Sequence, residues 1–216
     1  MIAGLYPLCD VDALGRVGLS PLSFVNAVLA ASPRPALLQL RAKSWSRERI
    51  AELLRALLPS TQAAGVPLVV NDHLDLALRA GAPFVNVGQS DPFDANAAVG
   101  LRWGRSTHSL PQLREAVAAR PDYVAYGPVF TTASKTTPEP TVGLEGLRAA
   151  HAIAREAGIP LCAIGGIDSE SLEVVGRHCE LVAVIGAVVD ADPAVVTERV
   201  SALGAALARA QRGQGR

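Results

Sequence analysis

The 216-residue chain has few cysteines, few aromatic residues and no excess of charge of either sign. Cys9, Cys162 and Cys179 form no CxxC pair and are odd in number, which argues against a disulfide framework and a zinc knuckle. Lys plus Arg (20) equals Asp plus Glu (20), so nothing indicates a nucleic acid or a membrane as partner. No apolar run approaches the ~18 residues of a membrane span. These absences favour a cytoplasmic protein that binds small molecules.

Half of the residues are hydrophobic, and many of them fall into eight short apolar runs. Continuous apolar runs, as opposed to alternating ones, are typical of parallel strands buried on both faces. The runs are IAGLYPL, ALLQL, PLVVN, FVNVG, LRWGRS, YVAYG, PLCAIGG and LVAVIGAV, which start at Ile2, Ala36, Pro67, Phe84, Leu101, Tyr123, Pro160 and Leu181.

The segments between these runs carry helical patterns. Apolar residues recur at helical spacing from Ile50 to Leu58 and from Val196 to Leu207. Helix starts are indicated at Ser20-Pro21, Ser109, Asp168-Ser169 and Asp192-Pro193. Eight strand-helix units in this length predict an α/β fold, a single-domain (β/α)8 TIM barrel over residues 1–208. An open doubly wound sheet is the alternative, and residues 209–216 are predicted to form a disordered tail.

Polar residues or glycines follow seven consecutive predicted strands, from the second to the eighth. In a (β/α)8 barrel the carboxyl ends of the strands meet at one mouth, where the chemistry takes place. We therefore expect these residues to converge there: Gln39, Arg41, Lys43, Asn71, Asp72, Asp91, Ser106, His108, Lys135, Gly165, Gly166, Ile185 and Gly186.

Asp72 and Asp91 follow adjacent strands and are the candidate metal ligands. Two such carboxylates suit a hard, oxygen-preferring cation such as Mg²⁺, although each aspartate would equally fit a helix N-cap. Three cations, Arg41, Lys43 and Lys135, are expected around the same opening. Together they favour a Mg²⁺-bound diphosphate over a monoanion, and a solvated rim is the alternative for the cations.

Glycines after the last two strands indicate a second anion. Backbone N–H groups at this place in such barrels commonly hold a phosphate, and Gly165, Gly166 and Gly186 permit its close approach. Tight turns are the alternative. His108 could act as a general base, but a neutral histidine that fixes a loop is favoured. The sequence thus predicts two anionic substrates.

Taken together, the motifs resemble those of the thiamine-phosphate synthase family. The resemblance covers most of the chain and rests on eight motifs in the family's order: QLRAK (39–43), ND (71–72), GQSD (88–91), GRSTH (104–108), DYVAYGPVF (122–130), TASK (132–135), GLEGL (143–147) and AIGGI (163–167). It implies a barrel that joins a pyrimidine diphosphate to a thiazole phosphate, with Mg²⁺ as cofactor.

The resemblance also implies roles for individual residues. Gln39 and Ser106 would contact the pyrimidine substrate, Asp72 and Asp91 would hold Mg²⁺, and Lys135, Ser106 and Arg41 would be catalytic. The pyrimidine diphosphate would lie among Arg41, Lys43, Asn71 and Lys135. The thiazole phosphate would be held by Thr132, Ala133, Ser134, Gly165, Gly166, Ile185 and Gly186.

The chain departs from the family's usual pattern at four positions. Members usually have His at Asn86, an acidic residue at Ser90, Thr at Ser134 and Ser at Gly186. Two alternatives follow: a thiazole tautomerase, which carries an acid/base His where this chain has Pro128, and a non-catalytic barrel that binds a thiazole phosphate. A monomer and a homo-oligomer both stay open.

Overall fold

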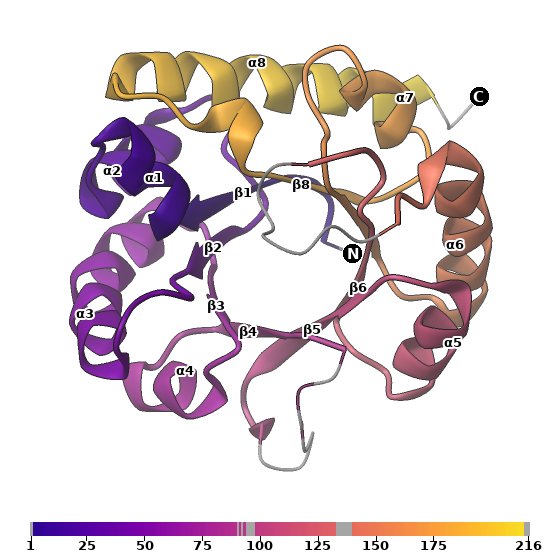
Figure 1. Cartoon of the computed structure of the whole chain (residues 1–216), viewed down its shortest axis with the longest axis horizontal. Helices are drawn as coiled ribbons and strands as arrows, with labels where there is room; N and C mark the ends of the chain where they lie inside the picture. Colours follow the sequence, from indigo (N-terminus) through magenta and orange to yellow (C-terminus); the bar gives the residue numbers. More distant parts are fainter. Residues whose placement is uncertain (1, 90, 92, 94–97, 133–139, 214–216) are drawn as a thin grey trace.

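The structure is a computed structural model that describes residues 2–89, 91, 93, 98–132 and 140–213. Eight parallel strands form a closed barrel in chain order (Figure 1). The strands are β1 (Gly4–Asp10), β2 (Leu38–Arg41), β3 (Leu68–Asn71), β4 (Phe84–Val87), β5 (Arg102–Thr107), β6 (Tyr123–Tyr126), β7 (Leu161–Ile164) and β8 (Leu181–Val184).

Pairing of the first and last strands closes the barrel. Gly4 of β1 lies opposite Leu181 of β8, and the register continues to Pro7 opposite Val184. Closure of the sheet confirms the predicted (β/α)8 barrel and excludes the open doubly wound sheet. Each of the eight predicted apolar runs contains one strand or most of it.

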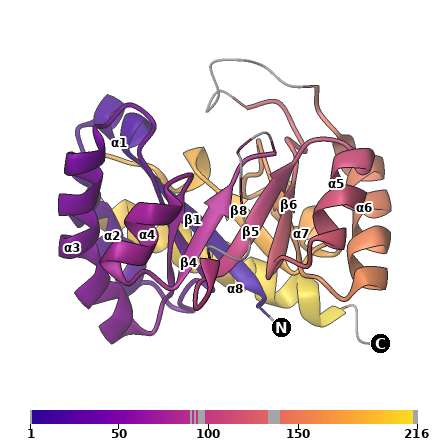
Figure 2. The same cartoon turned by 90° about the horizontal axis from the view of Figure 1, so that it is seen from below.

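Helices surround the barrel, and the side view shows them lying alongside the strands (Figures 1 and 2). They are α1 (Val11–Val17), α2 (Pro21–Ala30), α3 (Arg47–Ala64), α4 (Leu74–Ala80), α5 (Leu110–Ala118), α6 (Gly143–Ala157), α7 (Leu172–Gly176) and α8 (Pro193–Arg212). Both α1 and α2 lie between β1 and β2. Between β4 and β5 the described residues include no α-helix.

Helix starts follow the predicted capping residues in three places. Ser20, Ser109 and Asp192 are N-caps whose side chains accept a backbone N–H of the first turn. The prediction at Asp168-Ser169 was wrong by three residues. Asp168 accepts the N–H groups of Glu170 and Ser171 in a turn, and α7 begins at Leu172.

The predicted disordered tail begins too early. Helix α8 continues to Arg212, because Ala210 is buried and the side chain of Gln211 donates to the carbonyls of Cys179 and Glu180 at 3.1 and 2.8 Å. These contacts tie the last turn to the end of the barrel that lies opposite the carboxyl ends of the strands. Residues 214–216 lie outside the described part of the chain.

The core has two layers. The outer layer packs the helices on the barrel and includes the predicted stripes, such as Ile50 and Leu54 on α3 and Val200 on α8. The inner layer fills the barrel and contains two tyrosines, Tyr6 and Tyr123, among smaller apolar side chains. Their rings pack edge to face with centroids 5.8 Å apart. The interior of the barrel is therefore a packed core and not a channel.

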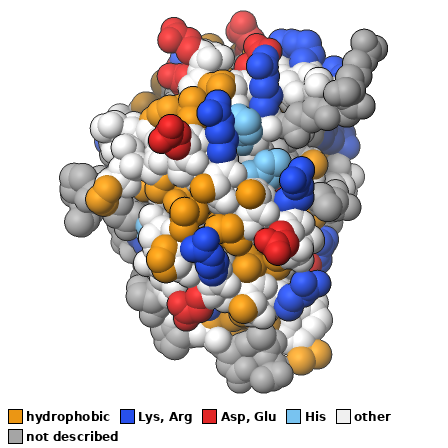
Figure 3. Space-filling model, turned by 90° about the vertical axis from the view of Figure 1, so that its right-hand side faces the viewer, with side chains coloured by type: hydrophobic (Ala, Val, Ile, Leu, Met, Phe, Trp, Pro, Cys, Tyr) orange, Lys and Arg blue, Asp and Glu red, His pale blue; other side chains and the backbone are white. Residues whose placement is uncertain are grey.

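The outer face that carries α5 and α6 shows apolar side chains interspersed with charges of both signs and with histidines (Figure 3). Among the described residues, no single helix is long and apolar enough to cross a membrane. Only α1 and α2 taken together meet that criterion, and they are bent by 99° relative to one another.

Candidate active site

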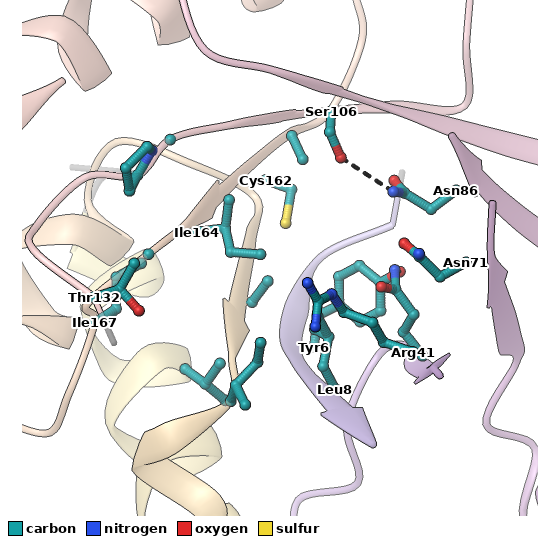
Figure 4. A pocket seen from close by; sticks show the side chains of 18 of the residues that line it. Tyr6, Leu8, Arg41, Asn71, Asn86, Ser106, Thr132, Cys162, Ile164 and Ile167 are labelled. Atoms are coloured by element: carbon teal, nitrogen blue, oxygen red, sulfur yellow. Dashed lines mark hydrogen bonds between the residues drawn. The ribbon is translucent and has the colours of Figure 1, made fainter. Parts of the chain in front are cut away.

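A cavity of about 710 Å³ lies at the carboxyl ends of the strands, where the barrel fold predicts the site. Figure 4 shows Arg41, Asn71 and Asn86 on one side of it and Thr132 and Ile167 on the other. The structure brings thirteen of the residues predicted at this mouth to the lining of the cavity: Gln39, Arg41, Lys43, Asn71, Asp72, Asp91, Ser106, His108, Thr132, Gly165, Gly166, Ile185 and Gly186. Ala133, Ser134 and Lys135 lie outside the described residues.

Arg41 is held by an aspartate that the sequence reasoning missed. Asp10, at the end of β1, forms an ion pair with the Arg41 guanidinium. The Asp10 side chain is only 3% exposed, and its second oxygen caps α1 by accepting from Ala13 N at 2.8 Å. One buried carboxylate therefore fixes both the start of α1 and the direction of the Arg41 side chain. Asp10 lies two residues beyond the end of the first apolar run, which is a sequence signal for a strand end, but nothing in the run indicates its pairing with Arg41.

Asp72 is available to a ligand. Helix α4 begins at Leu74 with His73 as the N-cap residue and without a capping side chain, so Asp72 does not have the N-cap role left open from sequence. Asp72 has a φ of 65°, a left-handed conformation uncommon outside glycine. Its Oδ2 lies 3.7 Å from the Nζ of Lys43. Asp72 and Lys43 thus lie together in the lining of the cavity.

Electrostatics around Asp72 favour a cation. Burial raises the pKa of Asp72, the ammonium group of Lys43 lowers it, and the nearby charge of Asp91 raises it again. Two partly buried carboxylates close enough to repel one another are stabilised by a shared cation. The donor set is oxygen, as Mg²⁺ prefers, and Mg²⁺ needs only one or two carboxylates from the protein. The residues present therefore fit this ion.

Asp91 is held by a tight turn after β4. Its Oδ2 accepts from Gly88 N at 2.8 Å, and a Cβ on Gly88 would lie 2.7 Å from the same oxygen. A side chain at this position would therefore displace the Asp91 carboxylate from its bond to Gly88 N. Arg105 steadies the turn from β5 by donating to the carbonyls of Gln89 and Asp91 at 2.9 and 3.3 Å. Asp91 accordingly keeps a fixed place beside Asp72.

The opposite side of the cavity is built from two glycines packed on the segment that follows β6. Gly165 and Gly166 have φ of 101° and 65°, and a Cβ on either would lie about 2.5 Å or less from Pro128 or Thr131. Backbone bonds continue the pairing of β6 and β7 here, since Val129 N donates to Ile164 O at 2.9 Å. The glycines thereby bring the backbone after β7 against the segment from Pro128 to Thr131, which leads to Thr132.

His108 fixes a loop, as favoured from the sequence. Its Nδ1 lies 2.6 Å from Gly127 O, and because a carbonyl can only accept, Nδ1 carries a proton. Its backbone N donates to Gln112 Oε1 at 2.8 Å. The first bond connects the ends of β5 and β6 on the cavity wall, and the second connects His108 to α5. The lining also includes residues that were not predicted as site residues, among them Tyr6 and Asp168.

Over most of its length the chain is similar to known proteins of one family. The family model described as "Thiamine monophosphate synthase" matches residues 6–188. The thiamine-phosphate synthase of Koribacter versatilis is 41% identical over 191 residues, covering 84% of this chain and 86% of that one. That of Roseiflexus sp. (strain RS-1) is 36% identical over 205 residues, covering 92% and 84%. The solved thiamine phosphate pyrophosphorylase from Pyrococcus furiosus superposes with a TM-score of 0.81 at 27% identity, covering 96% of each chain.

The matched segment runs from Tyr6 in β1 to Val188 after β8, and so contains every strand end that lines the cavity. Barrel, cavity and relatives agree: the chain belongs to the thiamine monophosphate synthase family.

Proposed function

We propose that this chain is a thiamine-phosphate synthase. It would join 4-amino-2-methyl-5-(diphosphooxymethyl)pyrimidine to hydroxyethylthiazole phosphate and release thiamine monophosphate and diphosphate. The observation that carries the proposal is one cavity with two unlike ends. Cations and two carboxylates gather at β2 to β4, whereas glycine backbone and a threonine gather after β6 and β7. Such a cavity suits two phosphorylated substrates held face to face.

The pyrimidine ring lies toward the barrel interior in this proposal. Gln39 is 4% exposed and offers an amide to an amino-substituted ring, and Ser106 lines the same region. A buried amide that pairs with the edge of a ring gives specificity because the wrong ring leaves it unpaired.

The diphosphate lies toward the rim, among Arg41, Lys43 and Asn71. Arg41 arrives already oriented by Asp10, so less side-chain freedom is lost when it binds an anion. Lys43 is 57% exposed and only loosely paired with Asp72, which leaves it able to move onto a substrate. Lys135 is assigned to the departing diphosphate from the family motif and lies outside the described residues.

Asp72 and Asp91 are assigned to Mg²⁺ on the fit described above. When bound there, the ion would neutralise charge on the diphosphate and so make it a better leaving group. The thiazole phosphate is assigned to Thr132, Gly165, Gly166, Ile185 and Gly186, with Ala133 and Ser134 added from the motif.

Chemistry in this cavity needs no protein nucleophile. The bond from the pyrimidine methylene carbon to the diphosphate oxygen breaks, and its electron pair leaves with diphosphate. The amino-pyrimidine ring spreads the resulting positive charge, and the lone pair of the thiazole nitrogen then forms the new C–N bond. Arg41 and Lys43 stabilise charge on the leaving group, while the cavity walls hold the thiazole in line and exclude water.

A thiazole tautomerase needs an acid/base group that this site lacks at the relevant position. Pro128, which lines the cavity, has no side chain able to transfer a proton. The relatives compared above carry the synthase name.

The test is the reaction itself. Purified protein, both substrates and Mg²⁺ should yield thiamine monophosphate and diphosphate in equal amounts, measured by liquid chromatography. EDTA should stop the reaction and excess Mg²⁺ should restore it. Absence of product from protein whose circular dichroism is that of a folded α/β barrel would refute the proposal, and isomerisation of a thiazole carboxylate phosphate in EDTA would favour the tautomerase.

A cytoplasmic location is supported by three free, buried cysteines. Whether the protein forms a homo-oligomer is a question for analytical ultracentrifugation.

A further inference from the structure

Five polar side chains from five different strands are joined by hydrogen bonds through the barrel interior. Gln39 Nε2 lies 2.6 Å from Tyr6 OH, and Tyr6 OH lies 2.9 Å from Tyr123 OH. Tyr123 OH lies 3.0 Å from Asn86 Oδ1, and Asn86 Nδ2 lies 3.1 Å from Ser106 Oγ. Figure 4 marks this last bond. We call the five residues the interior chain.

In the interior chain, each hydrogen bond determines which group donates in the next one, because a phenol has only one proton to donate. Tyr123 gives its proton to Asn86 Oδ1, so Tyr6 must donate to Tyr123. The oxygen of Tyr6 is then an acceptor, which suits the Gln39 amide nitrogen. Burial raises the pKa of both phenols above their ordinary value, so these protons are kept.

The two ends of the interior chain reach the cavity, whereas Tyr123 lies deeper. Gln39, Asn86 and Ser106 line the cavity, and Tyr123 is fully buried below it. Asn86 donates to Ser106 Oγ, and so the proton of the Ser106 hydroxyl is not used inside the interior chain. Likewise the Gln39 amide nitrogen donates to Tyr6 OH, and this bond fixes the orientation of the amide.

We propose that Tyr6, Tyr123 and Asn86 are positioning residues that fix Ser106 as a hydrogen-bond donor, and the Gln39 amide in one orientation, toward the pyrimidine substrate. The proposal rests on the proposed function and makes it more specific. The substrate must offer Ser106 an acceptor, which a ring nitrogen or a diphosphate oxygen supplies. Asn86 also gains a role in the position where the family usually has histidine.

The opposite sense of the interior chain makes a different prediction. If the Asn86 amide were turned over, Ser106 would donate inward to it and offer the cavity only an acceptor. Asn86→Asp separates the two senses, because a carboxylate at this position only accepts and must take the Ser106 proton. The substitution reverses Ser106 if the proposal is right and leaves Ser106 as it was if the opposite sense holds.

The experiment measures KM and kcat for both substrates at pH 8 in wild type, N86D, S106A and N86D/S106A. N86D should raise KM for the pyrimidine diphosphate by about tenfold, as the loss of one hydrogen bond to a polar or charged group implies. KM for the thiazole phosphate should stay within about twofold. Since Asn86 acts through Ser106, the double variant should be no worse than S106A alone.

Two controls separate positioning from folding. Asn26 is exposed on α2, and N26D adds the same charge far from the cavity, so it should leave both KM values unchanged. Y123F removes only the hydroxyl that orients Asn86 and serves if N86D does not fold. It should raise the pyrimidine KM by about threefold, a fraction of one hydrogen bond. This effect should be smaller in the S106A background, where Y123F can act only through Tyr6 and Gln39.

Binding of the unphosphorylated aminopyrimidine alcohol, measured by calorimetry, keeps this proposal distinct from the activity. If wild type makes no product but binds the alcohol, and N86D and S106A weaken binding without adding to one another, the interior chain stands and the synthase assignment falls. The proposal is overturned if N86D leaves both KM and binding unchanged, if its effect multiplies with that of S106A, or if wild type neither turns over nor binds the alcohol.

Discussion

Gly104 on β5 lies opposite Tyr123 on β6, and a Cβ on Gly104 would lie 2.1 Å from Cζ of the tyrosine ring. The ring thus occupies the space that a side chain on β5 would need. Tyr123 is fully buried and hydrogen-bonded to Tyr6 and Asn86, so its ring cannot move aside without breaking these contacts. Gly104 therefore supports the site through Tyr123, although it does not line the cavity.

We predict that Gly104→Ala destabilises the protein and impairs pyrimidine recognition together. Overpacking of a filled core costs about 1–3 kcal/mol, and displacement of Tyr123 breaks the interior chain. Urea unfolding gives the stability, and KM for the pyrimidine diphosphate gives the recognition. Gly15, exposed on α1, provides the control: an added Cβ would meet nothing within 4 Å, and G15A should stabilise by about 0.5–1 kcal/mol. Equal stability of G104A and wild type would contradict the prediction.

Asp10 has two roles that two substitutions can separate. Asp10→Asn keeps an oxygen for Ala13 N and loses the charge beside Arg41, and we expect it to cost about 1–3 kcal/mol of folding free energy. Asp10→Ala also loses the cap and should cost about 1 kcal/mol more.

Inorganic diphosphate provides the check on Asp10. If Asp10 orients Arg41 for an anion, D10N binds diphosphate more weakly, so diphosphate should raise the Tm of D10N less than that of wild type. If diphosphate raises both by the same amount, Asp10 has no part in orienting Arg41.

How much of this could be read from the sequence depends on how local each feature is. Strands buried on both faces appear as apolar runs wherever they pair, so all eight were predicted. The pairing of Gly4 with Leu181, which closes the barrel, joins residues far apart in the sequence. No local pattern indicates it, so closure was predicted from the number of strand-helix units and the chain length. Caps at Ser20 and Ser109 are local and were predicted correctly.

Site features that depend on distant partners were not predicted. Tyr6 and Tyr123 are 117 residues apart, and both stand within apolar runs, so nothing in the sequence indicates the hydrogen bond between them. Asp10 was missed because its partner, Arg41, lies 31 residues further along the chain. From the sequence, Asp72 could be either a helix N-cap or a metal ligand. The structure excludes the N-cap role, because Asp72 has a φ of 65° and α4 starts at Leu74 with His73 as its N-cap residue.

Asp72→Asn should stabilise the fold at neutral pH while impairing activity. The pKa of Asp72 is raised, chiefly by burial, so the folded protein binds its proton more tightly than the unfolded chain does. The stability this contributes is fully present below the unfolded pKa of about 3.9 and is lost as pH rises through the folded pKa. At pH 7 the ionised carboxylate therefore costs stability, and asparagine removes that cost.

The measurement is Tm from pH 3.5 to 8 with and without Mg²⁺. Without metal, D72N should exceed wild type at pH 7, and the difference should shrink toward pH ~4. With Mg²⁺, wild type should gain more than D72N, because an ion that binds the folded state stabilises it by mass action. A lower Tm for D72N at pH 7 without metal would show that the ion pair with Lys43 outweighs burial.

Gly186 offers the clearest place for a gain of function. It starts the short 3₁₀ turn Gly186–Val188 on the cavity wall, and a Cβ there would meet nothing within 4 Å. Its φ is not among the positive values found at other glycines, so a side chain brings no backbone strain. The family usually has serine at this position. Gly186→Ser should add a hydroxyl donor to the thiazole phosphate and lower its KM by about fivefold, the equivalent of ~1 kcal/mol for one hydrogen bond.

Gly165→Ala is the matched opposite. A Cβ there would lie 2.5 Å from Pro128 Cα at a φ of 101°, so the segment that carries Thr132 must shift. KM for the thiazole phosphate should rise in G165A and fall in G186S. KM for the pyrimidine diphosphate should change little in either, because Gly165 and Gly186 follow β7 and β8, whereas Arg41 and Asn71 belong to β2 and β3. If either substitution changed both KM values by the same factor, the two substrates would not bind at separate ends of the cavity, and the prediction would be wrong.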